Sequence, residues 1–362
     1  MNHFFVTISA RWNNTTQNLL PAYFAMVMAT GIVSIATYIY DMFILSQFLF
    51  YVDFIGYVIL WILSIYRVIV YGEYYLRDLG DHSRAPGFFT VIAGTNTLGS
   101  VFFVVEKNYT AAFDLWVFGL ILWFFYQYFI FVSLSLSKNK PSLENGINGA
   151  WLIAIVSTQS VAVLAAQLSP IHSWMYIFSL VFYMIGWLTY VLMMSLINYR
   201  LLFMKLNTND LTGPYWINMG ATAITTLAGV LIFLNGNESG FASQFDILRQ
   251  FLLGSALLMW AYGSWWIPWL LIVGILKYTK GRESLLNYDP LFWGGVFPMG
   301  MYTVSTYFLA KASGFKAFLV IPELFIYIAI AAWLYEFIGL IHSVVSRDRS
   351  SEENTVRNDS VS

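Results

Sequence analysis

The chain has 362 residues, of which 59% are hydrophobic, 19% aromatic and only 10% charged. Because a soluble globular domain carries about 25% charged residues, this composition excludes an ordinary soluble protein and indicates an integral membrane protein. The absence of Cys excludes disulfides and thiolate metal sites, and a formal net charge of −1 leaves no basic face for nucleic acid.

Ten apolar segments follow an N-terminal segment (1–14) that lacks the long apolar core of a cleavable signal peptide. A bilayer core of about 30 Å requires about 20 mostly apolar residues. The sequence therefore predicts an all-α domain over residues 15–345 with ten transmembrane helices, at approximately 19–40, 43–70, 87–105, 111–136, 147–168, 172–199, 215–234, 247–276, 290–310 and 317–345. The polar residues 346–362 predict a disordered tail.

The distribution of Lys and Arg predicts the orientation of these spans. With the N-terminus inside, every basic residue falls on the cytoplasmic side except Lys107, Arg249, Lys311 and Lys316. Cytoplasmic loops carry the excess of Lys and Arg in membrane proteins. We therefore expect a multi-pass plasma-membrane protein with both termini in the cytoplasm.

The odd-numbered segments differ in composition from the even-numbered ones. They carry small and hydroxyl residues, as in "MATGIVS", "AGTNTLGS", "VSTQS", "GATAITTLAG" and "GGVFPMG", whereas the even segments are bulky and aromatic. Four odd segments begin with Pro followed by aromatic residues, at Pro21, Pro86, Pro214 and Pro290. Pro suits the first helical position, where its missing N–H costs nothing.

The repeating pattern predicts five helical hairpins of roughly 65 residues, the third of them divergent. Small residues let membrane helices approach closely, and loosened backbone at membrane depth is tolerated only inside protein or beside a cavity. We therefore predict a quasi-fivefold ring, with five odd helices inside and five even helices outside, around a central pore. The alternative is that the small and hydroxyl residues only pack helices together.

The ninth segment places helix-weakening residues near its middle. Pro298 removes a backbone hydrogen bond and bends the helix, while Gly294, Gly295 and Gly300 leave Phe297 as the one large group beside the bend. A hydrophobic ring across a narrow pore blocks ions by dewetting it. The alternative is an ordinary core residue among 31 Phe. We also expect close helix packing or kinks at Gly31, Gly94 and Gly220.

The hairpin pattern, "PAYFAMVMATGI" in the first segment and "FWGGVFPMGMY" in the ninth resemble the tellurite-resistance/dicarboxylate transporter family over roughly residues 15–345. That family includes plant guard-cell slow anion channels, a bacterial tellurite-resistance channel, and fungal malate permeases and sulfite pumps. The resemblance implies a homotrimer in the lipid bilayer with one pore in each protomer. It also implies a Phe gate on the ninth helix, a position that Phe297 matches.

The inner segments contain no Asp, Glu, Lys or Arg between their ends, so the acidic ring of a cation channel is absent. Hydroxyls, Asn96 and Gln159 can solvate an anion weakly. The pore-lining candidates are Thr30, Ser34, Thr95, Thr97, Ser157, Thr158, Thr222, Thr226 and Thr303. The resemblance implies small anion substrates, either dicarboxylates such as malate or succinate, or chloride, nitrate or sulfite.

Two carboxyl groups lie inside even-numbered segments, Asp53 and Glu336. An intramembrane carboxylate is costly and by default indicates a functional site, here proton coupling. The alternative is a structural group at a contact between helices or subunits.

Three classes of function remain to be compared: a gated anion channel, a proton-coupled dicarboxylate or sulfite carrier, and a membrane-embedded enzyme. The sequence contains no H-E-x-x-H motif or Ser/His pair, its four His residues show no metal-ligand spacing, and no mid-membrane Lys is present to hold a retinal cofactor. We therefore predict no enzyme activity, metal or cofactor, and leave channel and carrier open.

Overall fold

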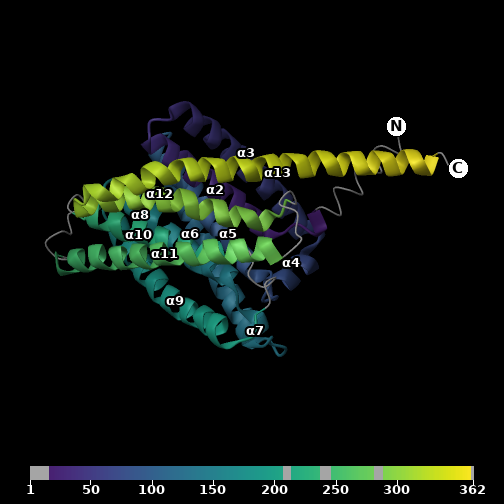
Figure 1. The fold of residues 1–362 in the computed structure, drawn as a ribbon, viewed down its shortest axis with the longest axis horizontal. Coiled ribbons are helices and arrows are strands. Elements are labelled where there is room, and N and C mark those ends of the chain that lie inside the picture. Colours follow the sequence, from purple (N-terminus) through teal and green to yellow (C-terminus); the bar gives the residue numbers. More distant parts are fainter. Residues whose placement is uncertain (1–15, 207–212, 237–245, 281–287, 360–362) are drawn as a thin grey trace.

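The computed structural model describes residues 16–206, 213–236, 246–280 and 288–359, and throughout these ranges the chain is helical or in turns, without a strand (Figure 1). The predicted N-terminal segment 1–14 lies outside the described residues. The prediction of an all-α protein is confirmed for the part that is described.

Five helices form the interior of the molecule. They are α2 (Phe24–Ile39), α5 (Phe89–Val104), α8 (Ile153–Leu168), α10 (Ile217–Asn235) and α12 (Trp293–Ser313). Each of them packs against two others, in the order α2, α5, α8, α10, α12 and back to α2. These five helices correspond to the five odd-numbered segments.

Each inner helix begins with a short 3-10 turn. These turns are η1 (Pro21–Tyr23), η2 (Ala85–Phe88), η3 (Gly149–Leu152), η5 (Gly213–Trp216) and η7 (Pro290–Phe292). The five turns contact one another in the same closed order as the helices that they precede. Pro fits this first turn because the N–H that it lacks would have no helical acceptor there. We call the end of the molecule that carries these turns the turn end.

Five longer helices lie outside the inner ones: α3 (Phe43–Val70), α6 (Tyr109–Leu136), α9 (Met175–Phe203), α11 (Asp246–Lys280) and α13 (Val320–Asp359). Each packs on the inner helix that precedes it in the chain and also contacts the inner helix that follows, with α13 contacting α2. Figure 1 shows α13 beside α12. Large apolar side chains on these outer helices are exposed, as expected for a surface that faces lipid.

Nine helices of the described chain are long and apolar enough to cross a membrane. Four of these spans contain α2, α5, α8 and α10 and are 72% to 94% buried within the protein, whereas the five outer spans are only 22% to 39% buried. The predicted ninth segment, 290–310, corresponds to α12, which is not among these nine helices, because its Gly, Pro, Ser, Thr and Tyr residues lower its apolar content.

The end of the chain is helical as far as the structure describes it. Helix α13 continues through the polar residues to Asp359, where a disordered tail was predicted over 346–362. Extending an existing helix adds a hydrogen bond for each residue and needs no new nucleus. The predicted disorder of this tail stays a prediction, and residues 360–362 lie outside the described residues.

Candidate functional site: a central cavity and its closure

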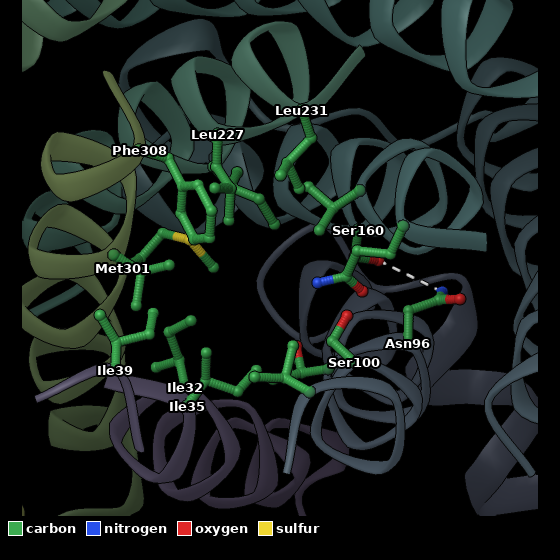
Figure 2. Close-up of a pocket in the computed structure, with 16 residues that line it drawn as sticks. Ile32, Ile35, Ile39, Asn96, Ser100, Ser160, Leu227, Leu231, Met301 and Phe308 are labelled. Carbon is green, nitrogen blue, oxygen red and sulfur yellow. Dashed lines mark hydrogen bonds between the residues drawn. The ribbon is translucent and has the colours of Figure 1, made fainter. Parts of the chain in front are cut away.

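A central cavity lies among the five inner helices, in the half of the molecule away from the turn end (Figure 2). Every inner helix contributes to its wall with residues spaced three or four apart, which is the spacing of one helix face. The lining residues are Ile32, Ile35 and Ile39 of α2; Asn96, Thr97, Ser100 and Val104 of α5; Ser160, Val163 and Gln167 of α8; Ile224, Leu227 and Leu231 of α10; and Met301, Val304 and Phe308 of α12.

Phe297 continues the cavity-lining face of α12 by one turn toward the turn end. It lies four residues before Met301, just as Gly220 lies four residues before Ile224 on α10. The equivalent positions on the other three helices are Met28, Ala93 and Val156, and the side chains at these positions are buried. Helical periodicity therefore places all five positions in one layer, at the end of the cavity that is nearer to the turn end.

The Phe297 ring packs where α10 has no side chain. A Cβ atom added at Gly220 would lie 3.1 Å from Cδ1 of Phe297 and 3.0 Å from Cγ of Pro298. The ring itself is only 2% exposed. The absence of a side chain at Gly220 thus provides the space in which Phe297 rests between α12 and α10.

Most of the hydroxyl residues predicted to line the pore face the outer helices. Among the predicted residues, Thr97 is the one that lines the cavity. Thr30 accepts a hydrogen bond from the indole N–H of Trp333 on α13 at 2.9 Å, and Thr158 accepts one from Trp123 on α6 at 2.9 Å. These two residues fit the alternative hypothesis, that the hydroxyls hold helices together.

This bonding pattern repeats around the molecule. In each case an aromatic N–H or O–H of an outer helix pairs with a polar side chain of the inner helix in the following hairpin. The five pairs are Tyr57–Thr95 at 3.0 Å, Trp123–Thr158 at 2.9 Å, Tyr190–Asn218 at 2.8 Å, Trp260–Thr306 at 2.9 Å and Trp333–Thr30 at 2.9 Å. We call them the interlayer pairs. A buried Trp or Tyr normally finds a hydrogen-bond partner, and this need explains where the hydroxyls point.

The other predicted lining residues are also placed away from the cavity wall. Ser34 bonds to Ser46 of α3, Thr226 donates to the carbonyl of Ala256 on α11, and Thr222 lies directly beneath Gly263 of α11. Ser157 and Thr303 donate to carbonyls of their own helices.

The polar part of the cavity wall comes mainly from residues outside the predicted pore-lining set. Ser100 lies on α5, and Ser160 and Gln167 lie on α8, while α2, α10 and α12 contribute only apolar side chains. Asn96 donates from Nδ2 to the Ser160 hydroxyl at 3.2 Å, as Figure 2 shows. The wall therefore has a hydroxyl and amide side and a hydrocarbon side, with no charged residue among the lining residues.

Comparison with known proteins agrees with this architecture. A family model described as SLAC1, voltage-dependent anion channel, matches residues 18–341. The chain belongs to the SLAC1 family. It is 24% identical over 340 residues to an uncharacterized transporter of Methanocaldococcus jannaschii, which covers 91% of this chain and 96% of the relative. It is 37% identical over 157 residues to an uncharacterized membrane protein of Mycobacterium tuberculosis, which covers 43% of this chain and 77% of the relative.

In this SLAC1-family protein the glycines predicted to allow close packing or kinks fall into two groups, one tightly packed against another helix and one loosely packed. At Gly31, Gly94, Gly220 and Gly300, an added Cβ would come within 3.3 Å of another helix, so the missing side chain permits close packing. Gly294 has only ordinary contacts, and a Cβ at Gly295 would meet nothing within 4 Å.

The two intramembrane carboxyls have different surroundings. Asp53 on α3 is fully buried, and neither of its oxygens has a hydrogen-bond partner in the described chain. Its carboxyl packs against Gly31 of α2, where an added Cβ would also touch the methyl of the cavity-lining Thr97. Glu336 on α13 is 7% exposed and lines a separate crevice at the turn end.

Basic residues at the turn end, whose distribution predicts the orientation, are in part buried. Arg67 of α3 is 2% exposed and pairs with Asp78 of α4 (Gly72–Leu79) at 2.5 Å, and Arg84 pairs with the other oxygen of Asp78 at 2.7 Å. The Arg67 Nε–H also donates to the carbonyl of Gln17 at 3.2 Å. The sequence offered one signal for this, an acidic residue 11 positions after Arg67.

Proposed function

We propose that the protein transports small anions across the plasma membrane through a pore in each protomer, and that Phe297 is the gate of that pore. One observation carries the proposal: each inner helix contributes one face to a single uncharged cavity, and Phe297 occupies the same face one turn further. The SLAC1 family of anion channels supports transport, rather than catalysis, as the activity.

The architecture that we propose is ten transmembrane helices in five hairpins with quasi-fivefold symmetry. The closed order of the inner helices, the same closed order of the 3-10 turns and the five interlayer pairs all support it. In this arrangement α12 spans the membrane despite its lower apolar content, because it is enclosed by α2 and α10. The bias of Lys and Arg supports a cytoplasmic position for the turn end and both termini.

The composition of the cavity wall supports anions as the transported species. Hydroxyl and amide groups can donate hydrogen bonds to an anion, and no carboxylate is present among the lining residues to attract a cation. Weak solvation at several places favours passage over tight binding. The substrate classes are dicarboxylates such as malate or succinate and inorganic anions such as chloride, nitrate or sulfite, and the assembly is a homotrimer, as the sequence resemblance implies.

The proposed gate works by excluding water. A phenyl ring that closes a narrow, uncharged lumen leaves an anion without solvation, so the barrier is the cost of dehydrating it. Pro298 lacks the N–H that would bond the carbonyl of Gly294. This missing bond gives the turn that carries Phe297 freedom to move.

The gate is tested by anion flux into proteoliposomes. Phe297→Ala should raise flux at least about tenfold, which corresponds to a barrier lower by about 1.4 kcal/mol. The matched control is Phe102→Ala on α5, because Phe102 packs against Phe50 and Phe54 of α3. Flux at or below the wild-type level in a well-assembled Phe297→Ala protein would contradict the gate.

The alternative is a proton-coupled dicarboxylate or sulfite carrier of the same fold. The observation in its favour is Asp53, a buried carboxyl without a hydrogen-bond partner in the described chain. It packs against Gly31 of α2, next in sequence to the cavity-lining Ile32. Glu336 is the second possible proton site. Measuring the same flux with and without a proton gradient distinguishes the two mechanisms, since a channel needs no proton gradient.

A further inference from the structure

A second hollow lies on the outside of the inner layer, at the turn end. It is a crevice walled by the 3-10 turns η5 and η7, the first turns of α12, the last turns of the α11 span, and α13. None of its lining residues lines the central cavity. Along α12 the crevice is lined by Gly295 and Met299, whereas Phe297 and Met301 continue the opposite, cavity-lining face.

The crevice exists because side chains are missing from its walls. At Gly274 of α11 and Gly295 of α12, an added Cβ would meet nothing within 4 Å. Both glycines line the crevice. Larger side chains at these two positions of α11 and α12 would fill the crevice.

One acidic group lies in an otherwise apolar and aromatic lining. Glu336 is 7% exposed and has no hydrogen-bond or salt-bridge partner in the described chain. The lining also contains Trp216, Tyr335 and Met299, and it contains no basic residue. Among the described residues, Asp289 acts electrostatically on Glu336, and it is another acid.

An uncompensated acidic group in a mostly buried place favours a positively charged partner. Aromatic walls add to this preference, because the faces of Trp and Tyr attract ammonium groups. An anionic ligand would be repelled by both Glu336 and Asp289. A neutral apolar ligand would leave the carboxyl without a partner.

We propose that this crevice is a binding site for a hydrophobic ammonium compound. The charged nitrogen lies against Glu336 and the aromatic faces, and the apolar body fills the space beside Gly274 and Gly295. Such a ligand would contact the turn of α12 that carries Phe297 on its other face. The crevice can bind this ligand whether or not the central cavity conducts anions. The test therefore measures ligand binding rather than anion flux.

The test uses the full chain in phosphatidylglycerol nanodiscs, whose lipid has no amine to compete. Binding of benzyltrimethylammonium is measured by calorimetric titration. We expect saturable binding that Glu336→Gln weakens by roughly tenfold or more. Glu323→Gln, which removes an exposed carboxyl from the same helix, should leave the affinity unchanged.

A second pair of variants tests the position of the site. Gly274→Trp fills the crevice and should abolish binding, whereas Gly254→Trp places the same side chain in open space elsewhere on α11 and should not. Anion flux through the same proteins reports separately on the proposed transport function. Equal binding by wild type and Glu336→Gln, or equal loss in both tryptophan variants, would overturn the proposal.

Discussion

At the scale of single residues, Phe297 depends on the neighbour that it contacts. The ring lies over Gly220, and the adjacent Pro298 packs on the same glycine. The proposed gate needs two matched positions on different helices, a large side chain and a missing one. The contact with Gly220 supplies this match and distinguishes Phe297 as the candidate gate among the 31 Phe residues of the chain.

Asp53 gives a residue-scale prediction that separates channel from carrier. Asp53→Asn keeps the shape of the side chain and removes its titratable proton. If Asp53 is structural, transport and its pH dependence should stay nearly unchanged, because an uncharged amide of the same shape places no charge in this fully buried position. Flux at several external pH values, with and without a proton gradient, checks this expectation. Loss of proton-driven uptake in a protein that assembles normally would favour the carrier.

At the scale of elements, the interlayer pairs join each outer helix to the next hairpin. These pairs give hydrogen-bond partners to polar side chains that would otherwise lack one inside the bilayer, where an unsatisfied polar group is costly. The inner helices thereby present mostly apolar faces to the cavity and polar faces to the outer layer.

The interlayer pairs predict different consequences for two neighbouring residues of α8. Thr158→Val removes the acceptor of the Trp123 N–H and should cost about 1–3 kcal/mol of stability, the penalty for an unsatisfied buried group. Its anion selectivity should remain that of wild type. Ser160→Ala, in the cavity wall, should instead change the relative flux of different anions. Thermal unfolding and flux ratios measure both effects, and altered selectivity in Thr158→Val would indicate that this hydroxyl reaches the pathway.

The paired charges at the turn end give a second prediction at this scale. Asp78→Ala leaves Arg67 buried without its partner, which should lower stability by about 3–5 kcal/mol. Asp114→Ala on α6 removes an exposed carboxylate and should have little effect. The midpoints of thermal unfolding in detergent compare the two, and equal midpoints would show that the buried pair contributes little.

At the scale of the whole molecule, the two layers differ in what surrounds them. Inner helices are enclosed by protein on nearly all sides, while outer helices expose bulky apolar side chains. Lipid and the partner protomers of the proposed trimer would cover that outer surface. The anion pathway is therefore expected within one chain rather than between chains.

Topology gives the prediction for the whole molecule. Because the chain contains no Cys, Ser351→Cys introduces a single thiol in the C-terminal part of α13. An impermeant thiol reagent should fail to label it in intact cells and should label it after permeabilisation. Lys316→Cys, on the predicted outer side, should react without permeabilisation. External labelling at position 351 would refute the cytoplasmic C-terminus.

The sequence by itself determined the class of protein, the hairpin repeat and the sorting of helices into two layers. These three features follow from the composition of the segments and from the spacing at which their pattern repeats. Lipid-facing helices need bulky apolar residues, and enclosed helices need small ones. It also singled out Phe297, since Gly and Pro beside a large ring form a local pattern.

Only the tertiary structure decided which face of each inner helix points into the cavity. The inner helices are buried on nearly all sides, so their sequences carry no strong contrast between one face and another. Thr158 and Ser160 illustrate this: both are small and polar, but the indole of Trp123 fixes Thr158 toward the outer layer and leaves Ser160 in the wall. The crevice beside Glu336 likewise arises where α11, α12 and α13 meet the turns η5 and η7, and no single segment of the chain encodes it.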